Sequence, residues 1–148
     1  MPHVHIQRTL DYSPEQLFDL VADIACYPEF VPWCEGLTIL EKREDAIEAM
    51  VLLGYKAIKT QFYCTIHLDR ASNIIAVEQR NGPFKQLRQS WKFLPVAEGK
   101  QTTIWFEMEF TLRSMVLNSL AGSVCGSMSG MFVDAFVQRA SRVYDTSI

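Results

Sequence analysis

The sequence lacks the excess of basic charge and the compact motifs by which several classes of protein are identified. Its 148 residues carry a net charge of −3, whereas a protein whose main role is to neutralise phosphates needs the opposite balance. No Gly-rich phosphate loop, G-x-S-x-G or H-E-x-x-H occurs, so P-loop, serine-hydrolase and zincin chemistries have no motif here. We therefore expect a protein that is not an enzyme, with no catalytic residue and no cofactor.

Closely spaced cysteines are also absent. The chain has four cysteines and no C-x-x-C pair among them: Cys26, Cys34, Cys64 and Cys125. This scatter is typical of free, mostly buried thiols in a reducing compartment. Neither a charged-then-apolar leader nor an Arg-rich transit segment opens the chain, and such segments direct export or import into organelles. We therefore expect a cytoplasmic protein, and peripheral association with the inner membrane is compatible with that location.

The titratable side chains do not form a recognisable site. Three histidines fall on strand faces that are otherwise polar: His3, His5 and His67. No further ligand is spaced to complete a zinc site, so we expect surface histidines and no metal. Glu107 and Glu109 form a close carboxylate pair on a predicted strand. Cross-strand ion pairs with Arg88 and Lys92 explain this pair better than acid/base catalysis does.

What the sequence does contain is the pattern of one α+β domain spanning 1–148. Hydrophobic residues make up 49% of the chain, and a domain of this size buries roughly two-thirds of its unfolded surface on folding. Apolar residues alternate from His3 to Leu10, which predicts a strand. Ser13-Pro14-Glu15-Gln16 then supplies an N-cap, a first-turn proline and a capping box. A short helix is therefore expected after the first strand.

The period of the apolar pattern changes to two between Leu37 and Leu112. Turn residues separate six further candidate strands, at 37–43, 46–54, 57–68, 73–80, 86–94 and 102–112. Short connections between consecutive strands imply an antiparallel meander. One face of each strand is apolar and the other is polar, so we expect a sheet with one covered side and one side in water.

A long helix is predicted from Ser114 to about Val143, because this stretch has no proline and repeats apolar residues at helical spacing. About 30 residues of helix would run roughly 45 Å and cross the whole sheet. Asn118 and several serines make a membrane span a poor interpretation. Glycines at 122, 126 and 130 fit either a helix that approaches the sheet closely or one that leaves a cavity beside it. The cavity is the more economical explanation.

The segment Tyr27-Pro28-Glu29-Phe30-Val31-Pro32-Trp33-Cys34 combines three aromatic rings with two prolines. Each proline removes a backbone donor and pushes the preceding residue toward extended geometry. We therefore expect the segment to be too short and too broken for a regular helix. Its rings must pack on the core, on a partner or on an apolar ligand.

Two stretches of the chain resemble signatures of the coenzyme Q-binding protein family, which also includes bacterial ribosome association toxins. The first runs from Asp11 to Asp23 and continues into 27–34. The second is Gly82-Pro83-Phe84-Lys85-x-Leu87-x-x-x-Trp91-x-Phe93. The resemblance covers nearly the whole chain in matching order, and an octapeptide with two prolines and a tryptophan is highly specific.

The resemblance implies a START-like helix-grip fold within the polyketide cyclase superfamily. In that fold a curved antiparallel sheet of about seven strands wraps around a long C-terminal helix, with one or two short helices after the first strand. It also implies non-catalytic binding of ubiquinone or a related polyprenyl lipid in an apolar tunnel, in support of respiratory electron transport. The alternative is a toxin-like module that binds the large ribosomal subunit and blocks subunit joining. Cyclase-like enzymology would need a polar group inside the tunnel, for which Arg8, Gln79 and Gln89 are the candidates.

The candidate ligand site combines a tunnel wall with a mouth. The mouth is expected at 27–34 and 81–84, where an irregular, aromatic chain suits gating or lipid contact. A fixed hydrophobic plug is the competing interpretation of these segments. The residues expected to contact the ligand are Tyr27, Phe30, Trp33, Phe62, Phe84, Trp91, Phe106, Phe110, Leu120, Val124, Met128 and Phe132.

The expected partners follow from these two functions. A quinone or lipid would occupy the tunnel, and transient contact with a membrane surface would accompany its release. The ribosome is the partner under the alternative, and no DNA partner is expected. A basic face for the ribosome would be supplied by Lys56, Lys59, Lys85, Arg88 and Lys92, although a solvated sheet surface is the simpler interpretation of these residues.

Overall fold

The computed structural model describes residues 3–55, 58–82, 84–112 and 115–145. Within these ranges the side chains at 55, 58, 84, 112 and 115–128 are not described. Several residues singled out in the sequence therefore lie outside the described side chains: Lys56, Phe84, Leu120, Val124 and Met128, together with the glycines at 122 and 126.

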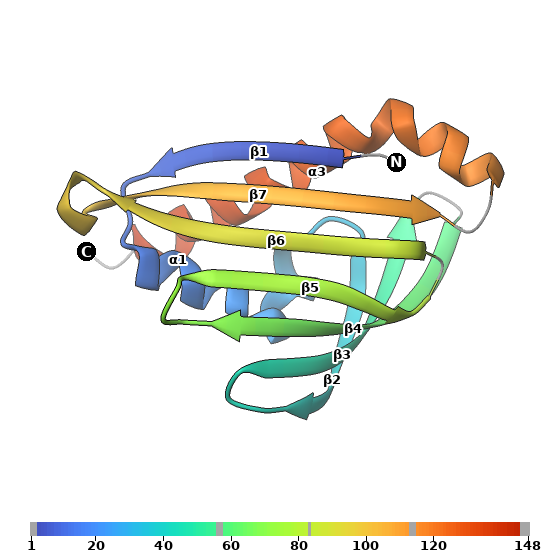
Figure 1. The fold of residues 1–148 in the computed structure, drawn as a ribbon, viewed down its shortest axis with the longest axis horizontal. Helices are drawn as coiled ribbons and strands as arrows, with labels where there is room; N and C mark the ends of the chain where they lie inside the picture. The colour runs from blue at the N-terminus through green and yellow to red at the C-terminus, as the bar shows by residue number, and fades with distance from the viewer. Residues whose placement is uncertain (1–2, 56–57, 83, 113–114, 146–148) are drawn as a thin grey trace.

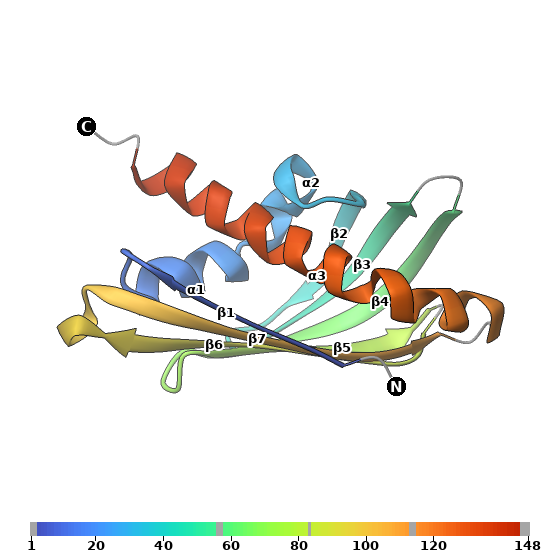
Figure 2. The same ribbon diagram turned by 90° about the horizontal axis from the view of Figure 1, so that it is seen from above.

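Seven antiparallel strands form one sheet in the order β1-β7-β6-β5-β4-β3-β2 (Figure 1). From β2 to β7 each strand pairs with its neighbour in sequence, which confirms the predicted meander, and β1 completes the sheet beside β7. The sheet is curved, so that β2, β3 and β4 rise on the side where the helices lie (Figure 2). The strands are β1 (His3–Leu10), β2 (Cys34–Lys42), β3 (Ala46–Tyr55), β4 (Ile58–Asp69), β5 (Ile74–Asn81), β6 (Phe84–Val96) and β7 (Gln101–Leu112).

The long helix and the short helices after the first strand lie on one face of the sheet (Figure 2). This arrangement confirms the expected helix-grip architecture. Among the described residues, no helix is both long enough and apolar enough to cross a bilayer. The helical elements are α1 (Pro14–Ala22), the 3₁₀ turns η1 (Ile24–Cys26) and η2 (Ala97–Gly99), α2 (Tyr27–Phe30) and α3 (Met115–Tyr144).

The first helix begins where the sequence predicts. The hydroxyl of Ser13 accepts a hydrogen bond from the backbone N–H of Gln16 at 3.2 Å, and the side chain of Gln16 accepts one from the backbone N–H of Ser13 at 2.9 Å. Pro14 occupies the start of the helix, where a missing backbone donor costs no internal hydrogen bond. The helix then buries one apolar face, which includes Leu17 and Phe18.

The segment 27–34 is more regular than expected, and that prediction is wrong for its first half. Tyr27–Phe30 forms one turn of α-helix, closed by a hydrogen bond from the N–H of Val31 to the carbonyl of Tyr27 at 2.8 Å. Pro28 is tolerated because it lies in the first turn, whose N–H groups have no partner inside the helix. Val31 is extended before Pro32, as expected for a residue that precedes proline.

The second half of the segment turns the chain into the sheet. Trp33 has a φ of 68°, in the left-handed region that residues with a Cβ rarely occupy. Its carbonyl accepts a hydrogen bond from the N–H of Gly54 at 2.8 Å. β2 then begins at Cys34, earlier than the predicted start at Leu37, because the ladder to β3 continues past an irregularity between Cys34 and Gly36. Such a bulge interrupts the alternation on which the prediction depended.

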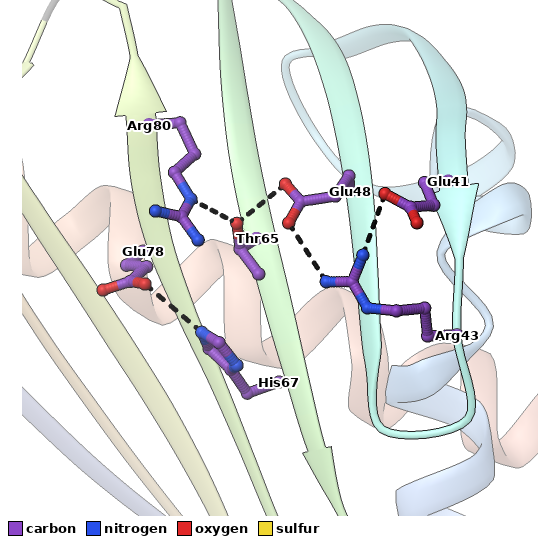
Figure 3. A network of polar contacts seen from close by, with 7 residues as sticks. All are labelled: Glu41, Arg43, Glu48, Thr65, His67, Glu78 and Arg80. Carbon is purple, nitrogen blue, oxygen red and sulfur yellow. Dashed lines mark hydrogen bonds and ion pairs between the residues drawn. The ribbon is translucent and has the colours of Figure 1, made fainter.

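The outer face of the sheet is polar, as predicted, and carries a network of charged side chains (Figure 3). Arg43 lies 2.8 Å from Glu41 and 3.4 Å from Glu48. Thr65 donates a hydrogen bond to Glu48 at 2.8 Å and accepts one from Nε of Arg80 at 2.7 Å. Glu48 and Arg80 flank Thr65 (Figure 3), which is fully buried. These contacts, the hydrogen bond from Thr65 first, hold the pKa of Glu48 below its usual range.

Replacing Glu48 with glutamine should lower the free energy of unfolding at neutral pH and have little effect in acid. A carboxyl whose pKa is lowered by folding contributes stability above its unfolded pKa, and this contribution is lost as the pH falls through the folded pKa. Urea unfolding of parent and variant across this range measures the effect. Glu41→Gln is the matched control, since its side chain is 59% exposed against 24% for Glu48. An effect of Glu48→Gln that is the same at neutral and acidic pH would contradict this account.

Candidate ligand-binding site

The inner face of the sheet meets α3 in a cluster of aromatic rings around Trp91. The centroid of its indole lies 4.7 Å from that of Phe106, 5.0 Å from that of Phe136 and 5.9 Å from that of Phe132. Trp91 is 1% exposed and Phe106 is 0% exposed. The structure thus brings three of the predicted site residues into mutual contact, and Phe136 joins them from the same helix. We call these four residues the closed end of the inner face.

Tyr27 and Phe30 pack onto the closed end from α2. Their ring centroids lie 5.2 Å and 5.1 Å from that of Phe136, in the edge-to-face geometry that aromatic pairs favour. The hydroxyl of Tyr27 donates to the carbonyl of Val21, and burial raises the pKa of Tyr27 well above its usual range. The guanidinium of Arg139 lies over the ring of Phe30 at 5.0 Å. These contacts fit the fixed-plug interpretation for both rings, and their contact with a ligand stays a prediction.

Four residues of the inner face keep slightly more exposure than Trp91. Leu87 and Phe110, which pair across β6 and β7, are each 8% exposed. Val51 and Phe62, which pair across β3 and β4, are 8% and 9% exposed. Phe110 lies near the C-terminal end of β7, and Leu87 lies opposite it near the start of β6. We call these four residues the open end, which includes the predicted site residues Phe62 and Phe110.

The glycine of the second signature permits a close approach at the open end. A Cβ built on Gly82 would lie 2.4 Å from Cβ of Phe62 and 3.1 Å from its Cα, and real side chains essentially never come so close. The connection between β5 and β6 can therefore lie against β4 only if this position is glycine. Phe84, on the other side of that connection, lies outside the described side chains.

Two of the polar groups considered for the interior lie on the inner face. Gln89 is half-buried between Leu87 and Trp91 on β6, and its side-chain oxygen accepts a hydrogen bond from Nε1 of Trp91 at 3.1 Å. Arg8 is instead exposed and lies 3.5 Å from Asp134, so it does not line the interior. Gln79 is half-buried on β5, opposite the inward-facing Cys64 of β4.

The cysteine thiols near the site are held in the protonated form. Burial raises the pKa of Cys34, and it raises the pKa of Cys64 to about 12. A hydrogen bond to Asp23 and then burial raise the pKa of Cys26 to about 11. Because the thiolate is the nucleophilic form of cysteine, none of these three thiols is activated at neutral pH.

The histidines lie on the outer face of the sheet, as predicted. His3, His5 and His67 are all exposed. The ring of His5 stacks on that of Trp105 at 4.0 Å, and Nε2 of His67 lies 3.3 Å from Glu78. A shallow hollow of about 320 Å³ lies on this face. Its charged lining has both signs and comprises His67, Glu78, Arg88, Glu107 and Glu109.

Acidic side chains interleave with the basic face considered for the ribosome. Lys59 lies 3.4 Å from Glu35. Arg88 stands directly opposite Glu109 in the register of β6 and β7, which confirms that these two are cross-strand neighbours. A hydrogen bond from the indole of Trp105, at 2.7 Å, lowers the pKa of Glu107 and keeps this carboxyl negative. The described part of this face is therefore mixed in charge.

Sequence reasoning missed two aromatic residues of the site. Phe136 follows Phe132 by about one helical turn and so shares its face, and that spacing was the available signal. Phe93 stacks with Trp91 at 6.3 Å and meets Phe18 of α1 at 5.9 Å. Its position on the apolar side of β6 was visible in the alternation, but the contact with α1 depends on the tertiary fold.

A curved antiparallel sheet that grips a long helix, with an apolar interior between the two, defines a START-like domain. The chain belongs to the family described as polyketide cyclase / dehydrase and lipid transport, whose model matches residues 10–137.

Individual proteins similar to the chain carry different functions. It is 33% identical to the ribosome association toxin RatA of Vibrio cholerae over 144 residues, which cover 97% of this chain and 99% of that protein. It is 27% identical to the mitochondrial coenzyme Q-binding protein COQ10 homolog B of Xenopus laevis over 139 residues, which cover 93% of this chain and 57% of that protein. The solved structure of the Zhui aromatase/cyclase from Streptomyces sp. R1128 matches with a TM-score of 0.86 at 17% identity, covering 99% of this chain and 98% of that one. At that identity the likeness establishes the fold alone.

Replacing Phe136 with alanine should lower the free energy of unfolding by about 3–5 kcal/mol. The change removes ring contacts with α2, with β6 and within α3 at once. Met131→Ala is the matched control, because Met131 lies on the same helix but is 55% exposed; we expect a change of at most about 0.5 kcal/mol. Urea denaturation measures both. Equal effects of the two substitutions would show that Phe136 does not hold α2 and α3 to the sheet.

Proposed function

We propose that the protein binds a hydrophobic ligand without catalysis, in the apolar interior between the sheet and α3. The observation that carries the proposal is a difference in residual exposure on the inner face of the sheet, which is 0–1% at Phe106 and Trp91 and 8–9% at the four residues of the open end. Apolar side chains that retain exposure inside a fold are typical of small-molecule sites. The most fitting ligand is ubiquinone or a related polyprenyl lipid, and its chaperoning would support respiratory electron transport.

The physical basis of binding would be burial of an isoprenoid tail. Each methylene removed from water contributes about 0.8 kcal/mol, and association costs about 4–15 kcal/mol of lost freedom and ordering. A tail of a few isoprene units is therefore enough to offset that cost. The closed end would set the depth that the ligand reaches, and the ligand would enter from the open end. A cytoplasmic protein that contacts the inner membrane transiently could load and release such a ligand.

Binding without catalysis agrees with the chemistry of the described interior. The thiols of Cys34 and Cys64 have raised pKa values, and the three histidines face away from α3 on the outer side of the sheet. Gln89 is a neutral amide and neither gives nor takes a proton at physiological pH. The similarity to a coenzyme Q-binding protein of Xenopus laevis supports the choice of a quinone as ligand.

Organic extraction of the purified protein, followed by mass spectrometry, tests the proposed function. We expect a quinone or polyprenyl lipid to co-purify, or to be taken up from detergent by the delipidated protein in one-to-one proportion. A protein that neither carries nor takes up such a lipid would contradict the proposal.

We propose that the side chain of Trp33 acts as a gate at the entrance of the ligand site. Its left-handed backbone stores strain on the order of 1 kcal/mol, and such strain clusters at sites that move or bind. Trp33→Ala keeps a Cβ, and therefore the strain, while it removes the ring. We expect this variant to lose bound quinone faster during gel filtration, with a smaller loss in thermal stability.

The control for Trp33 is Tyr63→Ala, which removes an aromatic ring that is 37% exposed on the outer side of β4. This control should retain quinone as the parent does. If Trp33→Ala and the parent retain bound quinone equally, Trp33 does not gate the entrance. The proposal that the protein binds a quinone would still stand.

A second candidate function is association with the large ribosomal subunit, with a block of subunit joining. The observation in its favour is the 33% identity to RatA of Vibrio cholerae over nearly all of both chains. The net charge of −3 and the acidic side chains among the basic ones on the outer face weigh against phosphate binding. Co-sedimentation of the lipid-free protein with ribosomal subunits, in an amount that falls as salt is added, would favour this function. A protein that does not co-sediment with the subunits at any salt concentration would exclude it.

A further inference from the structure

The orientation of Gln89 is fixed by the indole of Trp91. Nε1 of Trp91 lies 3.1 Å from Oε1 of Gln89, and an indole N–H can only donate. Gln89 must therefore turn its oxygen to Trp91 and its NH₂ group away. Nε2 of Gln89 lies 3.9 Å from the thioether of Met108, which is a weak acceptor. A strong donor is thus held on the inner face next to a weak acceptor.

Ser129 brings a second donor from α3. It is 2% exposed, and its hydroxyl has no hydrogen-bond partner among the described residues. A serine within a helix ordinarily bonds to a carbonyl one turn earlier or points to water, and a buried hydroxyl without a partner is destabilising. Ser129 lies on the same side of the helix as the buried Val133 and Phe136, the side that faces the sheet. An atom of a bound ligand would satisfy it.

Both donors lie on the same side of Trp91. Gln89 pairs with Met108 across β6 and β7, and Trp91 pairs with Phe106. Met108 is the next residue after Phe106 on the inward side of β7, so the pair of Gln89 and Met108 lies nearer to the start of α3. Ser129 precedes Phe132 by about 4.5 Å along the helix axis, again toward the start of α3, and the ring of Phe132 contacts that of Trp91. The register therefore assigns both donors to the layer between the closed end and the open end.

We infer that this layer receives the ring of the bound ligand, and that Gln89 and Ser129 select a ring that carries carbonyl oxygens. The inference rests on the proposed function. The carbonyls of a quinone only accept hydrogen bonds, so they match the fixed NH₂ group of Gln89 and the hydroxyl of Ser129. A quinol instead brings two O–H donors. Ser129 can accept one of them. The oxygen of Gln89 has a second lone pair, but it is turned toward Trp91 while the NH₂ group is turned away, so the site prefers the oxidised quinone.

The test compares three ligands with the same short tail: decyl-ubiquinone, its quinol, and decylbenzene, which has no ring oxygen. The parent protein should bind the quinone roughly 3- to 10-fold more tightly than the quinol, the effect of about one hydrogen bond. Ser129→Ala should weaken quinone binding by a similar factor and leave decylbenzene binding unchanged. Gln89→Leu should abolish the preference for the quinone. Ser90→Ala, on the outer side of β6, is the control and should change none of these affinities.

A thermal unfolding scan of the ligand-free variants separates recognition from a structural role. Because Ser129→Ala removes an unpaired buried hydroxyl, its Tm should equal or exceed that of the parent. A lower Tm together with a parallel loss of quinone and decylbenzene binding would show a structural role and overturn the inference. Equal affinities of the parent for quinone and quinol would also overturn it, while the proposed function would stand. A parent protein that binds none of the three ligands would refute the proposed function, and the inference with it.

Discussion

A buried tryptophan must place its indole N–H on an acceptor, and in this protein that requirement organises the interior. Trp91 meets it with the side chain of Gln89 on the same strand, so the plane of the indole is fixed against the inner face of the sheet. Phe136 of α3 packs against this ring, and Tyr27 and Phe30 of α2 pack in turn against Phe136. Phe136 therefore joins the long helix to the sheet through Trp91 and to the segment after α1 through Tyr27 and Phe30.

The concentration of aromatic packing at Trp91 also explains where the inner face of the sheet is most completely buried. Rings from β6, β7, α2 and α3 converge at the closed end. At the open end Gly82 lets the connection between β5 and β6 lie close to Phe62, and Leu87 and Phe110 keep residual exposure. The register of β6 and β7 and the rise of α3 assign Gln89 and Ser129 to a polar layer between the two ends. This order of apolar, polar and apolar layers matches a ligand that combines a polar ring with an apolar tail.

Local signals in the sequence were sufficient to predict most of the fold. Alternation predicts the strands, the run Ser13-Pro14-Glu15-Gln16 predicts the first helix, and short turns predict the meander, because each depends on neighbouring residues alone. Three features could not be predicted. The helical turn at Tyr27–Phe30 packs on α3 and the left-handed Trp33 bonds to Gly54, so both involve distant segments. Gln89 lies two residues from Trp91, but alternation does not specify the side-chain rotamers that bring the two together. For the candidate site, the apolar faces were predictable, but which rings meet was not.

The central claim, that the ligand lies between the inner face of the sheet and α3, is tested most directly by nuclear magnetic resonance. The measurement records intermolecular Overhauser effects between a short-tailed quinone and a methyl-labelled protein. Our account predicts signals from the ligand to the methyl groups of Leu87 and Val51, which lie on the inner face. It predicts none to those of Leu40, which is 55% exposed on β2. Signals to Leu40 without signals to Leu87 and Val51, at a saturating concentration of ligand, would contradict it.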